Sequence, residues 1–326
     1  MLTRRNAVTG ALAAAGAGLP LRAVAQIVAK PAQMIVGFAA GGGTDVSARI
    51  FAERLRGDYA ASVVVENKVG AAGRMAVEYV KNAPPDGSAM LFTSDFPVTL
   101  YPHIFKKLNY DSLRDLIAVA PLTKSSLVIS IGPLVPKDIV TLKGFLEWAK
   151  ANPDKASFAT TGAGGTPHFA GVMLSKESKV PLTAVHYRGG GPALQDLIGG
   201  HIAASVNPSS EALPLAQAGQ LRMLGAANSQ RSRFLPDVPT LREQGLDIAF
   251  DTWTGVFVTA GTPANIVAAL SAALEKATKA ADLIEAQAKL GNEIFFQSPG
   301  DFAVTVRASI ERWGPIVAAS GFVPED

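Results

Sequence analysis

The sequence predicts an α/β protein of two lobes, each a mostly parallel sheet flanked by helices, with two hinge strands crossing between them. One unit recurs along the chain: a short apolar strand, a turn of Gly, Ser and Thr, then a helix whose apolar residues repeat every three or four positions. That alternation is typical of parallel sheets covered by helices. A chain of 326 residues, 48% of them hydrophobic and 17% charged, is long enough for two compact domains.

The first 25 residues have the pattern of an export signal. Arg4 and Arg5 precede a run of small apolar residues that ends at Ala25 in the small-x-small order that signal peptidases cut. We expect cleavage after Ala25, by the Sec or the twin-arginine route, and a periplasmic protein. A membrane anchor is disfavoured, because glycines and a proline interrupt a run that is shorter than the about 20 apolar residues of a membrane span.

The charge and the cysteine content exclude several kinds of partner and site. The chain has 30 Lys and Arg against 27 Asp and Glu, and three of these arginines lie in the leader, so the mature chain is balanced. That balance gives no reason to expect nucleic acid or a membrane surface as a partner. The absence of cysteine from the sequence excludes disulfides, thiolate zinc sites and a cysteine nucleophile.

The first lobe begins with the strand "QMIVGF", the turn "GGG" and the helix "TDVSARIFAERL". Within this helix Val46, Ile50 and Leu55 are expected to share the buried face. The stretch "SVVVENKVGAAGRMAVEYVK" repeats the unit, and "GSAMLFTSD" adds a third strand.

The stretch "LIAVAPLTKSSLVISIGP" is expected to cross from the first lobe to the second, and "DTWTGVFVTAGTP" to return. These crossings predict the domain boundaries: an export signal over 1–25, a first lobe over 26–124 and 251–326, and a second lobe over 125–250.

The second lobe is expected to contain "KASFATTGAGGTPHFAGVML", "LTAVHYRGGGPALQDLIGG", the strand "HIAASVN" and a helix around "SSEALPLAQAG". Pro167 and Pro192 are each predicted at the first position of a helix, where a missing N–H costs nothing.

Two helices near the carboxyl terminus have recognisable ends. Thr262 is predicted to cap a helix whose first residue is Pro263. Ser298 and Asp301 have the spacing of a capping box, and Gly314-Pro315 is expected to kink or end that last helix.

The glycine-rich turns predict a site for a small anion. A helix that starts at Thr44 leaves its first amide groups unpaired and partially positive, and the glycines before it leave room for a ligand. The turns "TTGAGGTPH" and "RGGGP" repeat this arrangement. Each hydrogen bond to a charged group contributes ~1.5–3 kcal/mol, and micromolar binding needs about 8 kcal/mol. Four or five donors from turns of both lobes therefore suffice to hold a carboxylate.

Other kinds of site fit less well. Glu66 has the spacing of a ribose-binding acid, but "GGGTD" lacks the G-x-G-x-x-G order of a dinucleotide site, so a nucleotide-dependent oxidoreductase is the weaker alternative. P-loop and G-x-S-x-G motifs are absent, and the four histidines lack metal-ligand spacing. We expect no cofactor, no metal and no catalytic residue.

His168 is the histidine expected beside the cleft. Asp45 is expected to cap its own helix, the alternative being contact with a ligand ammonium.

The motifs taken together resemble the Bug family, the TctC-like receptors of tripartite tricarboxylate transporters. The resemblance covers nearly the whole mature chain, through "GGGTD", "VVVEN", "ATTGAGGTPH", "HYRGGGPALQDLIGGHI", "AGQLRMLG" and "RFLPDVPTLREQGL". It implies a periplasmic-binding-protein-like fold of type II, without catalysis, that captures a small carboxylate for the membrane subunits of a transporter. A ligand-sensing protein for a signalling partner is the alternative. The family's site then implies these ligand-binding residues, in a protein expected to be a monomer: Phe38, Gly42, Gly43, Thr44, Asp45, Thr93, Ser94, Thr161, Gly162, His168, Tyr187 and Asn207.

The sequence departs from the family pattern at a few positions. Ala39, Ala40 and Val69 replace prolines, and Arg74 stands where a small or polar residue is usual. Aspartates that the family often has after Gly199-Gly200 are replaced by Ala203 and Asn207. Losing these carboxylates disfavours a ligand ammonium, so we expect a di- or tricarboxylate, or an aromatic acid, over an amino acid.

Overall fold

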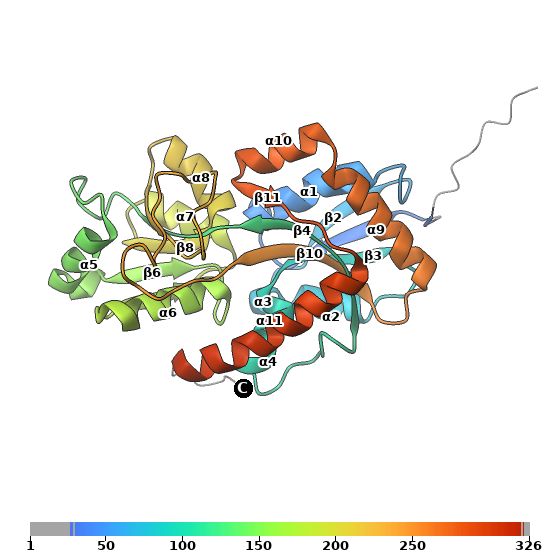
Figure 1. Cartoon of the computed structure of the whole chain (residues 1–326), viewed down its shortest axis with the longest axis horizontal. Coiled ribbons are helices and arrows are strands. Elements are labelled where there is room, and N and C mark those ends of the chain that lie inside the picture. The colour runs from blue at the N-terminus through green and yellow to red at the C-terminus, as the bar shows by residue number, and fades with distance from the viewer. Residues whose placement is uncertain (1–26, 29, 321, 323–326) are drawn as a thin grey trace, which may run out of the picture.

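The computed structural model describes residues 27–28, 30–320 and 322. The export signal predicted over 1–25 lies outside these residues. Within them the chain forms two α/β lobes, one on a six-stranded sheet and one on a five-stranded sheet. Figure 1 shows the two lobes side by side, with β4 and β10 extending toward the second lobe.

The first sheet has the strand order β11-β4-β10-β3-β1-β2. Strands β2 and β3 pair parallel with β1, whereas β10 is antiparallel to β3 and β4, and β11 is antiparallel to β4. The strands are β1 (Ala32–Val36), β2 (Val63–Asn67), β3 (Ala89–Ser94), β4 (Leu116–Ser125), β10 (Thr252–Thr259) and β11 (Asn292–Ile294).

The second sheet has the order β7-β6-β8-β5-β9. Strands β7 and β8 pair parallel with β6, and β5, which continues from β4, runs antiparallel to β8 and β9. Most described strands of each sheet therefore share one direction, and β5, β10 and β11 run against it. The strands are β5 (Leu127–Ile131), β6 (Ser157–Thr160), β7 (Thr183–His186), β8 (Ala204–Pro208) and β9 (Arg222–Ala226).

Helices flank both sheets. In the first lobe they are α1 (Gly43–Leu55), α2 (Arg74–Lys81), α3 (Phe96–Thr99), α4 (Tyr101–Ile104), α9 (Ala264–Thr278), α10 (Ala281–Lys289) and α11 (Pro299–Ser320), with a 3-10 turn at Ala71–Gly73. In the second lobe they are α5 (Leu142–Ala151), α6 (Thr166–Ser178), α7 (Gly190–Ile198) and α8 (Ser209–Gln217), with a 3-10 turn at Pro153–Lys155.

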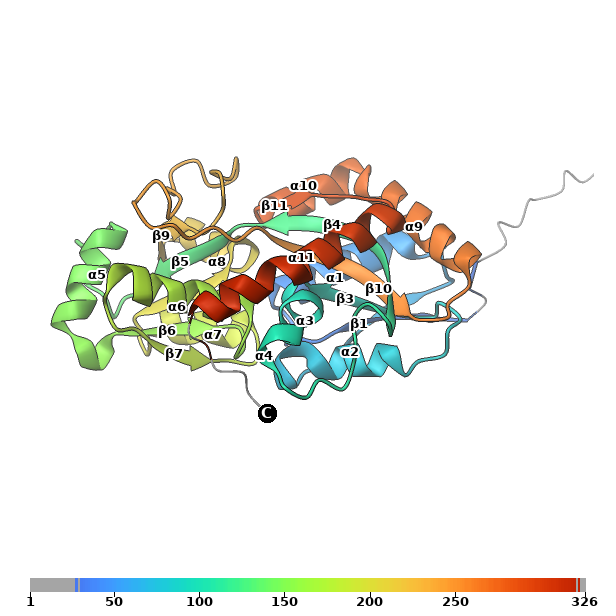
Figure 2. The ribbon, with the colours of Figure 1, turned by 60° about the horizontal axis from the view of Figure 1, so that its bottom comes forward.

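Helix α11 adds a third connection between the lobes. It packs on β4, α3 and α4 of the first lobe and reaches α6 of the second, and Figure 2 shows it running diagonally from one lobe to the other. Near its carboxyl end Trp313 is only 1% exposed. Its ring stacks on Phe250 at a centroid distance of 5.3 Å and packs against Phe169 of α6 at 6.0 Å.

The predicted buried face of α1 is partly wrong. Leu55 is buried as predicted, but Val46 and Ile50 are only half-buried, and the other large buried side chain is Phe51. The face is rotated because α10 also covers α1, where Ser47 Oγ donates to Gln287 Oε1 at 3.2 Å. Periodicity within one helix does not reveal a second neighbour of this kind.

Several predicted helix ends are shifted. Thr262 does not cap α9, because its hydroxyl donates to the Thr259 carbonyl, and Pro263 is the extended residue before the helix. Pro192 is the third residue of α7, not the first. Either position tolerates proline, since the N–H groups of the first turn have no intrahelical acceptor. Helix α11 continues through Pro315 to Ser320, so of the two outcomes predicted for Gly314-Pro315, a kink or an end, the end is wrong.

The predicted cap by Ser298 at the start of α11 is confirmed, but the Asp301 carboxylate accepts from the Ser298 hydroxyl and not, as in a full capping box, from its backbone N–H. Ser298 Oγ accepts from Asp301 N at 3.3 Å and donates to the Asp301 carboxylate at 2.6 Å.

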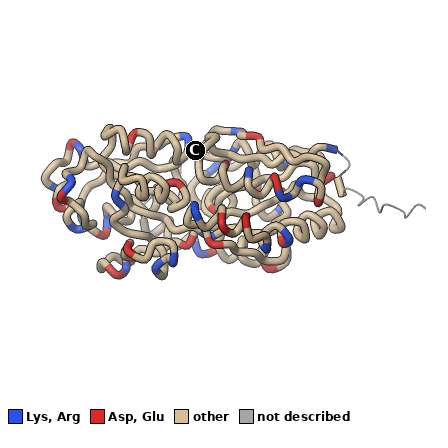
Figure 3. The backbone as a smooth tube through the Cα atoms, turned by 90° about the horizontal axis from the view of Figure 1, so that it is seen from above, with Lys and Arg blue, Asp and Glu red and all other residues tan. Residues whose placement is uncertain are grey.

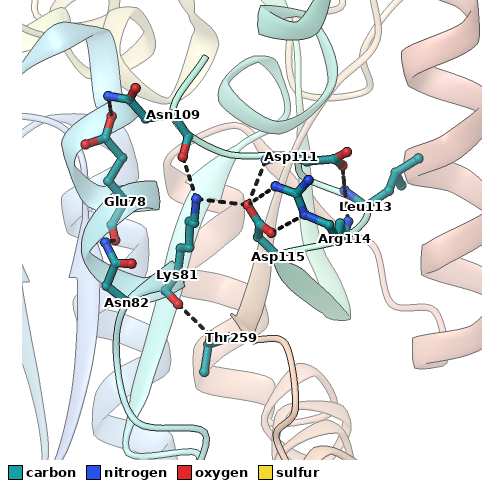
Figure 4. A network of polar contacts seen from close by, with 9 residues as sticks. All are labelled: Glu78, Lys81, Asn82, Asn109, Asp111, Leu113, Arg114, Asp115 and Thr259. Carbon is teal, nitrogen blue, oxygen red and sulfur yellow. Dashed lines mark hydrogen bonds and ion pairs between the residues drawn. The ribbon is translucent and has the colours of Figure 1, made fainter. Parts of the chain in front are cut away.

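A polar network holds the outer end of the first lobe together (Figure 4). The Asp115 carboxylate pairs with Arg114 at 2.7 Å and with Lys81 of α2 at 3.1 Å, and it accepts from Asp111 N. The hydrogen bond from Arg114 holds the pKa of Asp115 well below its usual range. Thr259, at the end of β10, donates to the Lys81 carbonyl and ties the strand to this network.

Charged residues of both signs are interspersed over the two lobes (Figure 3). Across the described part of the chain, no helix combines the length and the apolar character that crossing a bilayer requires.

Candidate functional site

A cavity of about 470 Å³ lies between the lobes. Residues 37–38, 69–72, 74–75 and 105 line it from the first lobe, and residues 161–163 and 186–188 line it from the second. Most of these segments directly follow the carboxyl ends of β1, β2, β6 and β7. Strand ends of this kind are where α/β sheets bind their ligands.

The described residues that line this cavity include two arginines and a histidine but no Asp or Glu. Arg74, the first residue of α2, lines it from the first lobe, and Arg188 and His186 line it from the second. The Arg74 guanidinium lies 3.8 Å from the centroid of the Phe105 ring, and its Nε donates to the Ala71 carbonyl at 3.1 Å. Within the described residues its two terminal nitrogens have no hydrogen-bond partner, so they are available to an anion.

Four of the residues predicted to bind ligand line this cavity: Phe38, Thr161, Gly162 and Tyr187. Phe38 packs edge-on against Phe96 at 5.6 Å. Tyr187 donates its hydroxyl to Asp196 Oδ2 at 2.6 Å. Burial, followed by this bond to Asp196, raises the pKa of Tyr187 to about 12, so the phenol stays protonated at neutral pH.

Three more predicted residues, Gly43, Thr44 and Ser94, line a second cavity of about 40 Å³ between the lobes. This volume holds about one water molecule. Asp95 also lines it, and within the described residues neither Asp95 Oδ1 nor Ser94 Oγ has a hydrogen-bond partner.

The amide groups of the glycine turn before α1 already have partners in the protein. Gly41 N donates to Asp45 Oδ2 at 2.9 Å, and Gly42 N to the Ala39 carbonyl at 3.3 Å. Gly43 N donates to Glu211 Oε1, from the second lobe, at 3.2 Å. The carboxylates that accept from Gly41 and Gly43, those of Asp45 and Glu211, therefore belong to the protein and not to a ligand.

The prediction that Asp45 caps the amides of its own helix is wrong. Its carboxylate reaches back to Gly41, ahead of the helix, because side chains on a helix point toward its N-terminus. It also accepts two hydrogen bonds from Arg49, at 3.0 and 2.9 Å, and one from Asn67 at 2.9 Å. Burial acts to raise the pKa of Asp45, but these bonds bring it below its usual value.

His168 lies behind the wall of the larger cavity. Its Nδ1 accepts from Gly164 N at 3.0 Å, which fixes the turn before α6. Burial, followed by the neighbouring His186, lowers the pKa of His168 to about 4, so the ring is neutral at neutral pH. Its ring packs edge-on against His186, which does line the cavity, at 4.6 Å.

Thr93 and Asn207 are buried in the two sheets and line neither cavity. Asn207 donates to Glu211 Oε2 at 2.8 Å. Glu66, the candidate ribose-binding acid, accepts from Gln33 and pairs with Lys68 at 3.0 Å. Among the described residues, no group of three or more His, Asp and Glu side chains is placed to hold a metal ion.

Sequence reasoning missed the basic side chains of the larger cavity, Arg74, His186 and Arg188. Each lies within a motif already noted for its glycines, which was the available signal. Arg74 was noted as a departure from the family pattern, but its direction depends on stacking against Phe105, about thirty residues away.

Asp95 makes stability depend on pH. Burial raises the pKa of Asp95 to about 7, although Arg312 acts in the opposite direction. The folded state therefore binds a proton that the unfolded state has released, and stability falls as the pH rises from about 4 to 7. We expect Asp95→Asn, which cannot ionise, to gain about 3 kcal/mol of stability relative to wild type between pH 4.5 and pH 8. Urea unfolding at both pH values measures this. An equal loss of stability at both would contradict it.

Known proteins are similar to this chain in both sequence and fold. The sequence matches the family described as "Tripartite tricarboxylate transporter family receptor" over residues 47–322. BugT of Bordetella pertussis is 30% identical over 98% of each chain. The periplasmic binding protein BugD is 28% identical, with a TM-score of 0.85 over 90% of this chain and 98% of that one. MatC from Rhodopseudomonas palustris, solved with bound malate, is 30% identical, with a TM-score of 0.82 over 88% of this chain and 98% of that one. The predicted periplasmic-binding-protein-like fold is confirmed.

Proposed function

Because this chain belongs to the tripartite tricarboxylate transporter receptor family, we propose that it captures a small organic acid in the 470 Å³ cavity and delivers it to membrane subunits of a transporter. The ligand class is a di- or tricarboxylate, or an aromatic acid. The protein acts in the periplasm as a monomer, after removal of residues 1–25.

The charge of the cavity carries this proposal. Arg74 lines the cavity from the first lobe and Arg188 from the second, and no Asp or Glu is among the described residues that line it. An arginine guanidinium matches a carboxylate with two parallel N–H donors, and such pairs are among the stronger hydrogen bonds in proteins. Malate, which MatC was solved with, is a dicarboxylate of a size that this cavity accommodates.

The lining of the cavity also favours an organic acid over an amino acid as the ligand. An ammonium group needs a carboxylate or several carbonyl acceptors, and burying it without them is costly. Asp45, the predicted alternative partner, is already paired with Arg49 and Asn67. A ligand with negative charge at both ends avoids this cost.

We propose that Phe38, Thr161, Gly162 and Tyr187 contact the ligand together with Arg74 and Arg188. Phe38 and the Arg74–Phe105 pair supply apolar surface for the ligand's carbon chain, and Thr161 supplies a hydroxyl donor. The other predicted residues do not line this cavity: Gly42, Gly43, Thr44, Asp45, Thr93, Ser94, His168 and Asn207.

A panel of ligands tests the function. The mature chain is heated with malate, adipate, citrate, benzoate, aspartate, arginine and NADH, and the unfolding temperature is recorded for each. A ligand at one hundred times its Kd stabilises the folded state by about 2.7 kcal/mol, which corresponds to a shift of several degrees. We expect such a shift with at least one of the first four compounds. Stabilisation by amino acids alone, or by NADH alone, would overturn the proposal.

A further inference from the structure

A glutamate of the second lobe reaches the first lobe at the start of helix α1. Glu211 lies in the first turn of α8, and its Oε1 accepts from Gly43 N, the first residue of α1, at 3.2 Å. Its other oxygen, Oε2, accepts from Asn207 Nδ2 at 2.8 Å. Glu211 is half-buried, and the loss of water around its carboxylate raises the pKa of Glu211 against the effect of both bonds.

The same carboxylate also fills the space at the start of helix α7. A Cβ added to Gly190, the first residue of α7, would overlap the Glu211 carboxylate. The Glu211 carboxylate is thus located where the N-termini of α1 and α7 meet, one from each lobe. Helix N-termini carry partial positive charge and free N–H groups, so this position suits an anion.

Glu211 and its neighbour Ser210 leave no room for a side chain at positions 43 and 190. A Cβ added to Gly43 would lie 2.6 Å from Ser210 Oγ and 2.8 Å from Glu211 Cγ, closer than side chains approach one another. Gly191, one residue after Gly190, has nothing within 4 Å of an added Cβ. The lack of a side chain is therefore needed at Gly190 and not at Gly191.

We propose that Glu211 is a positioning residue that closes the inner end of the cleft with the protein's own carboxylate. It holds the lobes together through Gly43, and it leaves the neighbouring cavity, with Arg74 and Arg188, as the place for the ligand's charge. The assignment of the ligand's charge to the neighbouring cavity rests on the proposed function. The contact of Glu211 that holds the lobes together does not.

The first test measures the distance between the lobes without any ligand. The sequence contains no cysteine, so spin labels attach only at introduced sites, Glu53→Cys in α1 and Lys143→Cys in α5, which are both exposed. We expect Glu211→Ala to shift the distance distribution away from that of the labelled parent protein. Glu211→Gln keeps one carbonyl oxygen to accept from Gly43 N, and we expect it to retain the parent distribution. An unchanged distribution in Glu211→Ala would overturn the proposal.

The second test uses the glycines. Gly190→Ala displaces the carboxylate and is expected to give the same shift as Glu211→Ala, whereas Gly191→Ala, its matched control, leaves the distribution unchanged. In the Glu211→Ala background Gly190→Ala should add nothing, because the overlapping group is gone. Equal effects of the two glycine variants, or additive effects of Gly190→Ala and Glu211→Ala, would contradict the role assigned to Glu211.

The third measurement links the closure to binding. With the carboxylate that stabilises the parent protein best in the panel, we expect Glu211→Ala to weaken the affinity roughly tenfold without changing the order of preference among the ligands. If no carboxylate binds the parent protein, the proposed function fails. The distances between the lobes measured without ligand still decide whether Glu211 holds the two lobes together. A change in ligand preference would instead place Glu211 in the ligand site and overturn the assignment.

Discussion

Replacing Arg74 with alanine is expected to weaken carboxylate binding by about ten- to a hundredfold. The reason is the loss of charged hydrogen bonds worth ~1.5–3 kcal/mol, at about 1.4 kcal/mol for each factor of ten. Arg74→Lys keeps the charge but loses the planar pair of donors, so we expect an intermediate affinity. Isothermal calorimetry with the best carboxylate of the panel measures these differences.

The control for this prediction is Arg233→Ala. Arg233 also lies over a phenyl ring, that of Phe234 at 4.7 Å, but it does not line the cavity between the lobes. Its loss should leave the affinity within a factor of two of wild type. The binding role assigned to Arg74 fails if the two alanine variants bind the ligand equally well.

Replacing Trp313 with alanine is expected to destabilise the protein by about 3–5 kcal/mol, as truncation of a fully buried aromatic side chain does. Trp313 lies between Phe250 and Phe169 at the point where α11 meets the second lobe. Its indole N–H has no hydrogen-bond partner among the described residues. Trp313→Phe therefore loses packing only, and we expect a smaller cost.

Urea unfolding of the purified chain measures both variants. Val304→Ala is the matched control, because Val304 lies on the same helix and is 68% exposed. Its effect should stay within about 0.5 kcal/mol. If Trp313→Ala costs no more than this control, then α11 does not stabilise the protein through the second lobe.

Part of the candidate site could be predicted from the sequence. The glycine and threonine turns after the strands indicated where ligands bind, and Phe38, Thr161, Gly162 and Tyr187 line the cavity there. The charge of the cavity was missed, because the motif reasoning followed backbone amides rather than side chains. Those amides at Gly41 to Gly43 are used by the protein itself.

The sequence by itself determined the kind of elements, their order, the two-lobed architecture and the family, which the match over residues 47–322 confirms. These follow from local periodicity, turn residues and motif spacing, which a single segment carries. Only the tertiary structure decided which group occupies each anion position. Gly43 and Glu211 are 168 positions apart, and Arg74 takes its direction from Phe105 on another segment. Helix termini attract negative charge from any source, so the packing of the two lobes selects the carboxylate that reaches them.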